Sequence, residues 1–279
     1  MIDLNALIVK ARDLDPLPAS ATRLAALVAR AEVDTREVVE VVSLDQALTA
    51  RLLRFANSVA SASVSPVKTV KQAVVRIGNA TVLAIAVAGG VSRRMKQPVP
   101  QYGMTEDQLW RHSVAAALAT EEIQRRCVPN IPPEAFTAAL LHDVGKLILA
   151  RFLAPEIVEL LARAQGEGGL TRLQAEAELL GVQHAELGGL IAQLWGLPEG
   201  IVSGVTYHHT PELGHSVLCD MVCVANGVAK GVRVAPVPQP IRPEEHGDAF
   251  MRLGLKLEEL PELSATVGNR FLAVLAQFD

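Results

Sequence analysis

The sequence predicts an all-α protein built from helices packed on helices, and three observations support this fold class. Half of the 279 residues are hydrophobic and only 4% are aromatic, and Ala, Leu and Val dominate the hydrophobic residues. This composition favours helices over a β-sandwich, which uses more aromatic residues and threonine. Apolar residues also recur with helical spacing in successive segments, and no segment has the pattern of a convincing strand.

The first 97 residues predict a series of short helices, each preceded by a residue that can cap a helix N-terminus. The expected capping residues are Ser20, Asp34 or Thr35, Asp45, and Thr69. An apolar stripe follows each of them. Gly78 is typical of a helix C-terminus, and Asn79 then begins an apolar helix that we expect to end near Gly90.

A proline-containing connector over 96–103 is a candidate boundary between two lobes. Beyond it, Thr105 followed by Gln108 has the pattern of a capping box, and the helix that it starts continues through 110–126. After a break with three prolines, one helix beginning at Glu134 is expected to carry the whole stretch LLHDVGKLIL. The remaining helices are expected over 173–180, 185–195, 215–229 and part of 249–278, with an exposed Pro-rich loop before the last.

The charge balance gives no general attraction to nucleic acid or to an anionic membrane, because the formal net charge is −4 and the sequence pI is about 6.0. Short basic clusters at 93–96 and 125–126 are interpreted as solvated helix ends.

The longest apolar run, 80–91, is too short to span a bilayer, and acids among the first residues argue against a signal peptide. Three cysteines fit a reducing compartment, with Cys219 and Cys223 as buried thiols. We therefore expect a soluble, cytoplasmic protein whose partners include neither nucleic acid nor membrane.

A group of histidines with one aspartate stands out in the second half of the chain. The group comprises His112, His142, Asp143, His184, His208 and His209. Imidazole and carboxylate together suit a mid-row divalent cation such as Fe or Mn, and mixed sites also hold Mg or Zn. Helices of a bundle can assemble such a site from distant segments. A single histidine of this kind is more often an ordinary hydrogen-bonded residue, so it is the whole set that favours a metal site.

The stretch HDVGK adds chemistry to this set. Adjacent His142 and Asp143 can hold one ion between their side chains, and such a pair needs partners if it is buried. Gly145 is expected to leave the wall of the site open. Lys146, four residues after His142, would share its helical face and can meet a phosphate. The alternative is that the stretch forms the polar end of a core helix.

The order of these residues resembles the HD superfamily of metal-dependent phosphohydrolases and, more narrowly, the HDOD domain, an HD-related output module of bacterial signalling proteins. The resemblance covers about 14–230 and rests on six segments in family order: LDPLPAS, SLDQALTARLLRFANS, TVKQAVVRIG, LWRHSVAAALA, AALLHDVGKLIL and ELLGVQHAELGGLIAQLWGLPEGIVSGVTYHH. It implies a two-lobed helical domain, with an N-terminal lobe over 14–97 and an HD-like helical bundle over 104–230. An N-terminal segment over 1–13 would precede this domain, and a Pro-rich loop with a helical tail over 231–279 would follow it.

The resemblance also assigns roles to the polar residues. The ligands of a first metal would be His112, His142 and Asp143. Candidate ligands of a second metal, beside the shared aspartate, would be His184, His208 and His209. Lys146 matches the lysine that faces substrate phosphate in the HD-GYP relatives.

This chain departs from the family pattern at two places. A late aspartate is expected among the metal ligands, but the position that matches it is Asn226, and the GYP element after the histidine pair is missing. An amide oxygen can coordinate a cation, yet it removes one negative charge. Asp220 lies six residues earlier, about 240° around the same helix, so it cannot replace Asn226 from the same face.

Three functions remain open at this point. HDOD modules resemble degenerate HD domains, so the leading hypothesis is a non-catalytic regulatory protein of bacterial signal transduction that binds signalling proteins or a ligand. An intermediate hypothesis adds a bound metal with a structural or sensory role. The alternative is a metal-dependent phosphohydrolase acting on a nucleotide or cyclic dinucleotide, in which Asp143 and Lys146 would take part in catalysis. The substitution at Asn226 favours the first hypothesis, and the retained ligand positions favour the other two.

Overall fold

The computed structural model describes residues 16–30, 32–57, 66–127, 130–166, 169–232 and 247–278. Within these ranges every regular element is a helix, and the one β-interaction is an isolated bridge between Val99 and Met104. The predicted all-α fold class is therefore confirmed.

The N-terminal helices are α2 (Ala19–Val28), α3 (Thr35–Ser43), α4 (Gln46–Ala56), α5 (Val70–Ile77) and α6 (Asn79–Met95). The side chains of Asp34, Asp45 and Thr69 accept hydrogen bonds from backbone N–H groups at the starts of α3, α4 and α5, which confirms these caps. The expected cap at Ser20 is wrong. Helix α2 already begins at Ala19, and the Ser20 hydroxyl instead donates to Asp45 Oδ2 over 2.6 Å.

Helix α6 runs past Gly90, its expected end, as far as Met95. The glycines there serve close packing rather than helix termination. A Cβ on Gly89 would collide with the guanidinium group of Arg51, and a Cβ on Gly90 would lie 2.6 Å from the ring of Pro18. Among the described helices, none by itself is long and apolar enough to cross a membrane. Helices α5 and α6 together have the length and composition of a membrane span, but the chain bends by 109° between them.

The connector after α6 contains a short 3-10 helix, η2 (Pro100–Tyr102), and leads to α7 (Gln108–Gln124). The predicted cap at Thr105 is wrong, because Asp107 precedes α7 and no side chain caps this helix; only the hydrogen bond from the Thr105 backbone N–H to Gln108 Oε1 (2.7 Å) is present. The following helices are α8 (Ala135–Leu141), α9 (Gly145–Phe152), α10 (Pro155–Gly166), α11 (Arg172–Leu180), α12 (His184–Leu194), α13 (Glu199–Thr206), α14 (Pro211–Gly214) and α15 (Val217–Gly231). The last described elements are α16 (Gly247–Arg252), η4 (Leu257–Glu259) and α17 (Leu260–Phe278).

Two expectations about these helices are wrong. The single helix predicted from Glu134 through LLHDVGKLIL is broken by a turn over 142–144, which separates α8 from α9. The helix predicted to start at His215 starts at Val217, because His215 adopts a left-handed conformation (φ 47°) and Ser216 caps the helix. The predicted Pro-rich loop lies outside the described residues.

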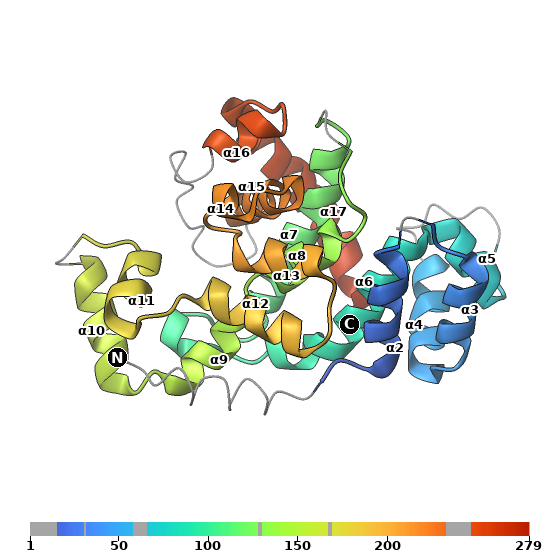
Figure 1. The fold of residues 1–279 in the computed structure, drawn as a ribbon, viewed down its shortest axis with the longest axis horizontal. Coiled ribbons are helices and arrows are strands. Elements are labelled where there is room, and N and C mark those ends of the chain that lie inside the picture. Colours follow the sequence, from blue (N-terminus) through green and yellow to red (C-terminus); the bar gives the residue numbers. More distant parts are fainter. Residues whose placement is uncertain are drawn as a thin grey trace.

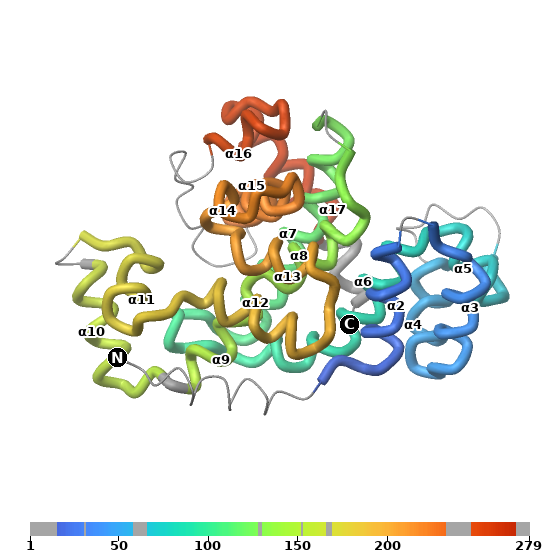
Figure 2. Tube along the Cα trace, viewed as in Figure 1, coloured from blue at the N-terminus to red at the C-terminus, as the bar shows by residue number. Residues whose placement is uncertain are grey.

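The helices are arranged so that α2–α5 lie at one end of the molecule and α10 and α11 at the other, with α14–α17 above the middle (Figure 1). The chain can be followed from the blue N-terminal helices to the red C-terminal ones in Figure 2. Helices α7 and α15 pack against each other, and every residue from Leu218 to Ala229 is buried. A helix that is buried on all sides belongs to the core, so Asn226 on α15 lies within the core of the protein. The limits of the two lobes, 14–97 and 104–230, stay predictions.

Candidate metal centre

Asp143 lies at the centre of the predicted set of polar residues, in the turn between α8 and α9. Its Oδ2 atom lies 3.5 Å from His112 Nε2 and 3.3 Å from His142 Nε2. Its Oδ1 atom lies 3.2 Å from His184 Nε2 and 3.9 Å from His208 Nε2. One buried carboxylate therefore stands between four imidazoles that come from separate parts of the chain.

The turn that carries Asp143 is tighter than an α-helix. Backbone N–H groups there bond three residues back, as from Val144 to Leu141 O (2.9 Å). On the following helix, a Cβ at Gly145 would collide with the backbone oxygen of His184 and lie 2.6 Å from Gly188 N. The expectation that Gly145 leaves the wall of the site open is therefore wrong. Glycine is needed because α9 and α12 approach each other there, and this approach brings His184 to Asp143.

Two of the histidines are oriented by backbone carbonyl groups. His142 Nδ1 lies 2.7 Å from Ala139 O, and His208 Nδ1 lies 2.7 Å from Val205 O. A carbonyl oxygen only accepts, so each Nδ1 donates, and Nε2 of each ring points away from that carbonyl. Both Nε2 atoms, together with Asp143 Oδ1, are buried without a hydrogen-bond partner among the described residues. Such orphaned atoms are rare in folded proteins, and here they converge on one point, as the ligands of a cation would.

His184 begins α12, and a buried carboxylate that was not predicted holds its ring. Glu176 Oε2 accepts hydrogen bonds from the backbone N–H of His184 (2.9 Å) and from His184 Nδ1 (2.8 Å). Glu176 Oε1 accepts from the Tyr102 hydroxyl (2.9 Å) and from Arg172 Nε (3.5 Å). Burial by itself would raise the pKa of Glu176, but the attraction of His184 and these hydrogen bonds lower it to about 2. Glu176 is therefore ionised and fixes His184 with Nε2 toward Asp143.

The six predicted residues form two neighbouring groups of potential ligands. His209 completes the set, since its Nε2 lies 3.2 Å from His184 Nε2. Within each group the ligand atoms lie within 4.8 Å of one another: His184, His208 and His209 in one, and His112, His142 and Asp143 in the other. The structure thus brings together residues that the sequence spreads over nearly one hundred positions, from 112 to 209.

Asn226 lies at the site, as the resemblance implies, and its Oδ1 atom is 3.2 Å from His112 Nε2. Asp220 points elsewhere. It forms a bidentate ion pair with Arg252, in which Nε lies 3.0 Å from Asp220 Oδ2 and Nη2 lies 2.6 Å from Asp220 Oδ1. The expectation that Asp220 cannot replace Asn226 agrees with this pairing. Helix α15 therefore contributes an amide, and not a carboxylate, to the site.

Lys146 is paired within the protein. Its Nζ atom lies 2.6 Å from Asp143 Oδ2 and 5.7 Å from the centroid of the Tyr102 ring. The prediction that Lys146 shares a continuous helical face with His142 is wrong, because the turn places it on a new helix. Burial opposes the ionisation of Asp143, but the attraction of His142 and Lys146 holds the pKa of Asp143 well below its usual value.

The imidazoles differ in how readily they take up a proton. Burial lowers the pKa of His112 to about 3 and places the pKa values of His208 and His209 well below the usual value. Burial acts on His184 in the same direction, but the attraction of Glu176 and the hydrogen bonds to Asp143 and Glu176 together outweigh it and raise the pKa of His184. His112, His208 and His209 are thus held in the neutral form that can bind a metal ion, whereas a proton on His184 Nε2 must be released before that atom can bind one.

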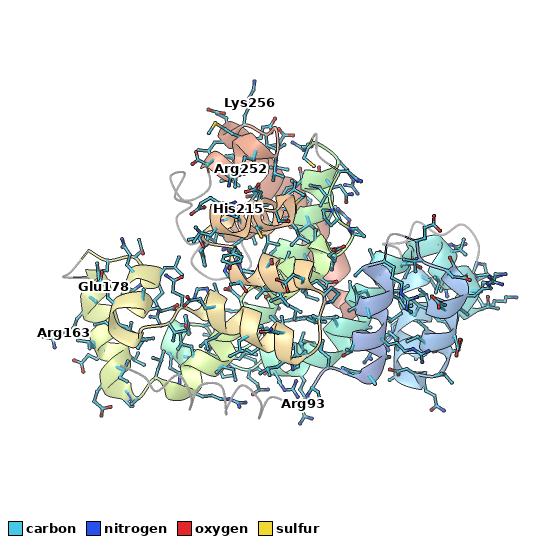
Figure 3. All side chains as sticks on the ribbon, in the orientation of Figure 1. Arg93, Arg163, Glu178, His215, Arg252 and Lys256 are labelled. Carbon is cyan, nitrogen blue, oxygen red and sulfur yellow. The ribbon has the colours of Figure 1, made fainter. Side chains whose placement is uncertain are left out.

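Sequence reasoning missed three residues that support the site: Tyr102, Arg172 and Glu176. The guanidinium carbon of Arg172 lies 4.3 Å from the centroid of the Tyr102 ring, so the two residues also stack. One signal was available, because Glu176 shares the buried face of α11 with Leu180, four residues on, where an apolar residue would be expected. His215, interpreted as a surface residue, is exposed and lies outside the site (Figure 3).

Comparisons with known proteins identify the family of this chain. The family model of the HDOD domain matches residues 14–211. A curated relative, an uncharacterized protein of Treponema pallidum (strain Nichols), is 23% identical over 200 residues, which cover 71% of this chain. The match covers only 38% of that relative, so this chain corresponds to well under half of its length.

Three solved structures share the fold. A presumed phosphohydrolase from Shewanella amazonensis SB2B is 28% identical with a TM-score of 0.70, and the match covers 98% of each chain. An HDOD domain protein of unknown function from Geobacter sulfurreducens is 24% identical with a TM-score of 0.71, covering 99% of this chain and 98% of the other. A presumed signal transduction protein from Marinobacter aquaeolei VT8 is 22% identical with a TM-score of 0.75, covering 99% of this chain and 64% of the other. With a family match over most of its length and the same helical architecture, this chain belongs to the HDOD domain family.

Proposed function

We propose that this chain is a regulatory HDOD protein of bacterial signal transduction, which acts by binding a partner or ligand at a retained metal centre and does not turn over a phosphoester. The observation that carries the proposal is the arrangement around Asp143. Buried ligand atoms without hydrogen-bond partners converge there, while the late carboxylate of the catalytic relatives is replaced by Asn226.

The residues present fit a divalent cation. His112, His142, His184, His208 and His209 supply imidazole nitrogens around the Asp143 carboxylate, and Asn226 supplies an amide oxygen. This nitrogen-rich set suits Fe, Mn or Zn, whereas Mg prefers oxygen ligands and retains several waters. A cation bound there would neutralise the charge of a phosphate group and polarise its oxygens.

The reduced negative charge argues against hydrolysis. Two metal ions that share one site need carboxylates to offset their charge, and Asp143 is the one carboxylate within reach of both ligand groups among the described residues. Its Oδ2 atom is also engaged by the Lys146 ammonium. A centre with one shared carboxylate and an internal ammonium is better suited to holding an anionic ligand than to activating water at two ions.

The ligand class that fits such a centre is a phosphate-bearing molecule such as a nucleotide, and the protein partners would be other signalling proteins. The proposal includes no nucleic acid and no membrane. The net charge of −4 supports this choice, because it provides no general attraction to polyanions or to an anionic bilayer.

The alternative function is a metal-dependent phosphohydrolase acting on a nucleotide or cyclic dinucleotide. It is favoured by the retained ligand positions and by the name of the Shewanella amazonensis neighbour, which is 28% identical to this chain. Asp143 would then hold the metal ions, and Lys146 would leave Asp143 to face the substrate phosphate.

The two functions are separated by assaying the full chain, after supplementation with Fe, Mn or Zn, with a chromogenic phosphodiester and with cyclic dinucleotides. We expect stoichiometric metal, no turnover above that of Asp143→Ala, and nucleotide binding that His184→Ala weakens. Metal-dependent hydrolysis that disappears in Asp143→Ala would establish the enzyme and reject the regulatory proposal. Absence of bound metal in the wild-type protein would reject the metal centre.

A further inference from the structure

The two oxygens of Asp143 have different surroundings, which divides the centre into two unequal halves. Oδ2 pairs with the Lys146 ammonium at 2.6 Å, on the side of His112 and His142. Oδ1 has no hydrogen-bond partner among the described residues and faces His184 and His208. A cation that approaches Oδ2 meets a positive charge already in place, whereas one that approaches Oδ1 does not.

The Oδ1 side offers a complete set of four donors. Donors of one four-coordinate ion lie about 3.4 Å apart when each is about 2.1 Å from the ion. His184 Nε2 lies 3.2 Å from both Asp143 Oδ1 and His209 Nε2, and His208 Nε2 lies 3.9 Å from Oδ1. The three imidazole nitrogens therefore lie within 4.8 Å of one another, and two of them lie within 4 Å of Asp143 Oδ1.

On the Oδ2 side the distances between potential ligand atoms are similar, but the charge of the surrounding groups is unfavourable for a cation. His112 Nε2 and His142 Nε2 lie 3.5 and 3.3 Å from Oδ2, so spacing does not exclude an ion. The remaining polar groups exclude an ion there. Asn226 contributes no charge and hydrogen-bonds to His112, and Lys146 adds a positive charge. An ion on this side would have to displace the Lys146 ammonium and leave that charge without its carboxylate partner.

Glu176 strengthens the Oδ1 side. It is fully buried, and both of its oxygens are saturated by donors, from His184 on one oxygen and from Tyr102 and Arg172 on the other. A carboxylate that accepts the Nδ1 proton of a ligating histidine fixes the ring and makes Nε2 a stronger donor. Its negative charge, which the Arg172 guanidinium partly offsets, lies behind the Oδ1 side of the centre.

We propose that this chain binds one divalent cation rather than two, held by His184, His208, His209 and Asp143 Oδ1, with Glu176 as the positioning residue of His184. The Lys146 ammonium takes the place of a second cation beside Oδ2. This inference rests on the metal centre of the proposed function and specifies its stoichiometry and location.

The location is tested by titrating the chelator-treated full chain with Co²⁺ alone, followed by calorimetry and by the visible absorption of the bound ion. We expect one Co²⁺ per chain in the wild-type protein and in His112→Ala, with the absorption of a four-coordinate ion. His209→Ala should lose the ion. Two ions per wild-type chain, or an ion that depends on His112 and not on His209, would overturn the inference while leaving the metal centre of the proposed function intact. No binding by the wild-type protein would reject both.

The role of Glu176 is tested with Glu176→Gln, which keeps the size of the side chain and removes its charge. The matched control is Glu178→Gln on the same helix, whose side chain is exposed at the periphery (Figure 3). We expect Glu176→Gln to weaken Co²⁺ binding by about 10- to 100-fold and to alter the absorption of the bound ion, because an oriented histidine is lost. Glu178→Gln should match the wild-type protein.

If Glu176→Gln changes thermal stability but neither Co²⁺ affinity nor the absorption spectrum, Glu176 is merely structural and its assignment as a positioning residue is wrong. If Glu176→Gln fails to fold, Tyr102→Phe is the second test, because it removes one hydrogen-bond donor to Glu176. We expect it to weaken Co²⁺ binding by less than Glu176→Gln.

Discussion

Asn226 Oδ1 lies 3.2 Å from His112 Nε2, so a neutral amide from α15 hydrogen-bonds with a histidine of the candidate metal centre, at the position where the resemblance to the HD superfamily implies a carboxylate. The exchange is small in volume but removes one full negative charge from a buried site. Together with the Lys146 ammonium on Asp143 Oδ2, it leaves the His112 side of the centre too positive for a cation.

Restoring this negative charge should allow a second ion to bind, on the Oδ2 side of Asp143. We expect the double variant Asn226→Asp/Lys146→Met to bind two Co²⁺ ions per chain, because it adds a carboxylate and removes the competing ammonium. Metal analysis after equilibrium dialysis measures the stoichiometry, and Asp220→Asn, which changes an acidic residue of α15 outside the site, is a control for general charge effects. A stoichiometry that stays at one in the double variant would show that charge is not what excludes the second ion.

The close approach of α9 and α12 predicts that Gly145 tolerates no side chain. Gly145→Ala should lower the free energy of unfolding by about 1–3 kcal/mol, because its Cβ would meet backbone atoms of His184 and Gly188 that cannot move aside separately. Gly268→Ala, on α17, is the matched control, since the nearest atom to its Cβ lies 3.7 Å away on Val232. The control should be neutral or should gain up to about 1 kcal/mol from helix propensity. Urea unfolding of both variants checks the pair, and equal effects would contradict the packing argument.

The low pKa of His112 predicts a loss of stability in mild acid for the metal-free protein. Burial lowers this pKa to about 3, against 6.5 for an unperturbed histidine. Between these values the unfolded chain binds a proton that the folded chain does not. The contribution of His112 to stability is therefore complete above pH 6.5 and is lost as the pH falls toward 3, with a slope of about 1.4 kcal/mol per pH unit.

The measurement is the free energy of urea unfolding from pH 7 to pH 5, where the pKa of about 2 keeps Glu176 ionised in the folded protein. His112→Gln should flatten the slope by the contribution of one proton. His208 and His209, whose pKa values burial also lowers, would continue to titrate in both proteins. Identical slopes for the variant and the wild-type protein would mean that His112 is not buried as a neutral ring.

The ion pair between Asp220 and Arg252 predicts how α16 is attached to α15. Arg252→Met should destabilise the protein by about 1–3 kcal/mol, because Asp220 is mostly buried and would lose its bidentate partner. The control is Arg36→Met, which removes an exposed arginine from its pair with Asp34 and should change stability little. Thermal unfolding at low and moderate salt separates the two, and a small effect of Arg252→Met would show that α16 is held by apolar packing alone.

Local signals predicted most of the N-terminal helices. Asp34, Asp45 and Thr69 were identified as caps because the bond they form reaches only two or three residues along the chain. The same reasoning failed at Ser20, whose hydroxyl is used in a contact 25 residues away. It also failed at the turn over 142–144, which depends on the tight packing of Gly145 against α12.

The sequence by itself determined the fold class, the family and the ligand-type residues around Asp143, because helical periodicity, capping and motif order are properties of neighbouring residues. Only the tertiary structure decided what each ligand can do. Packing between helices distant in sequence decides which oxygen of Asp143 each histidine faces and whether Lys146 is free or paired. It also places Glu176 behind His184. In a buried site these contacts set the charge balance, and through it the number of ions that the site can hold.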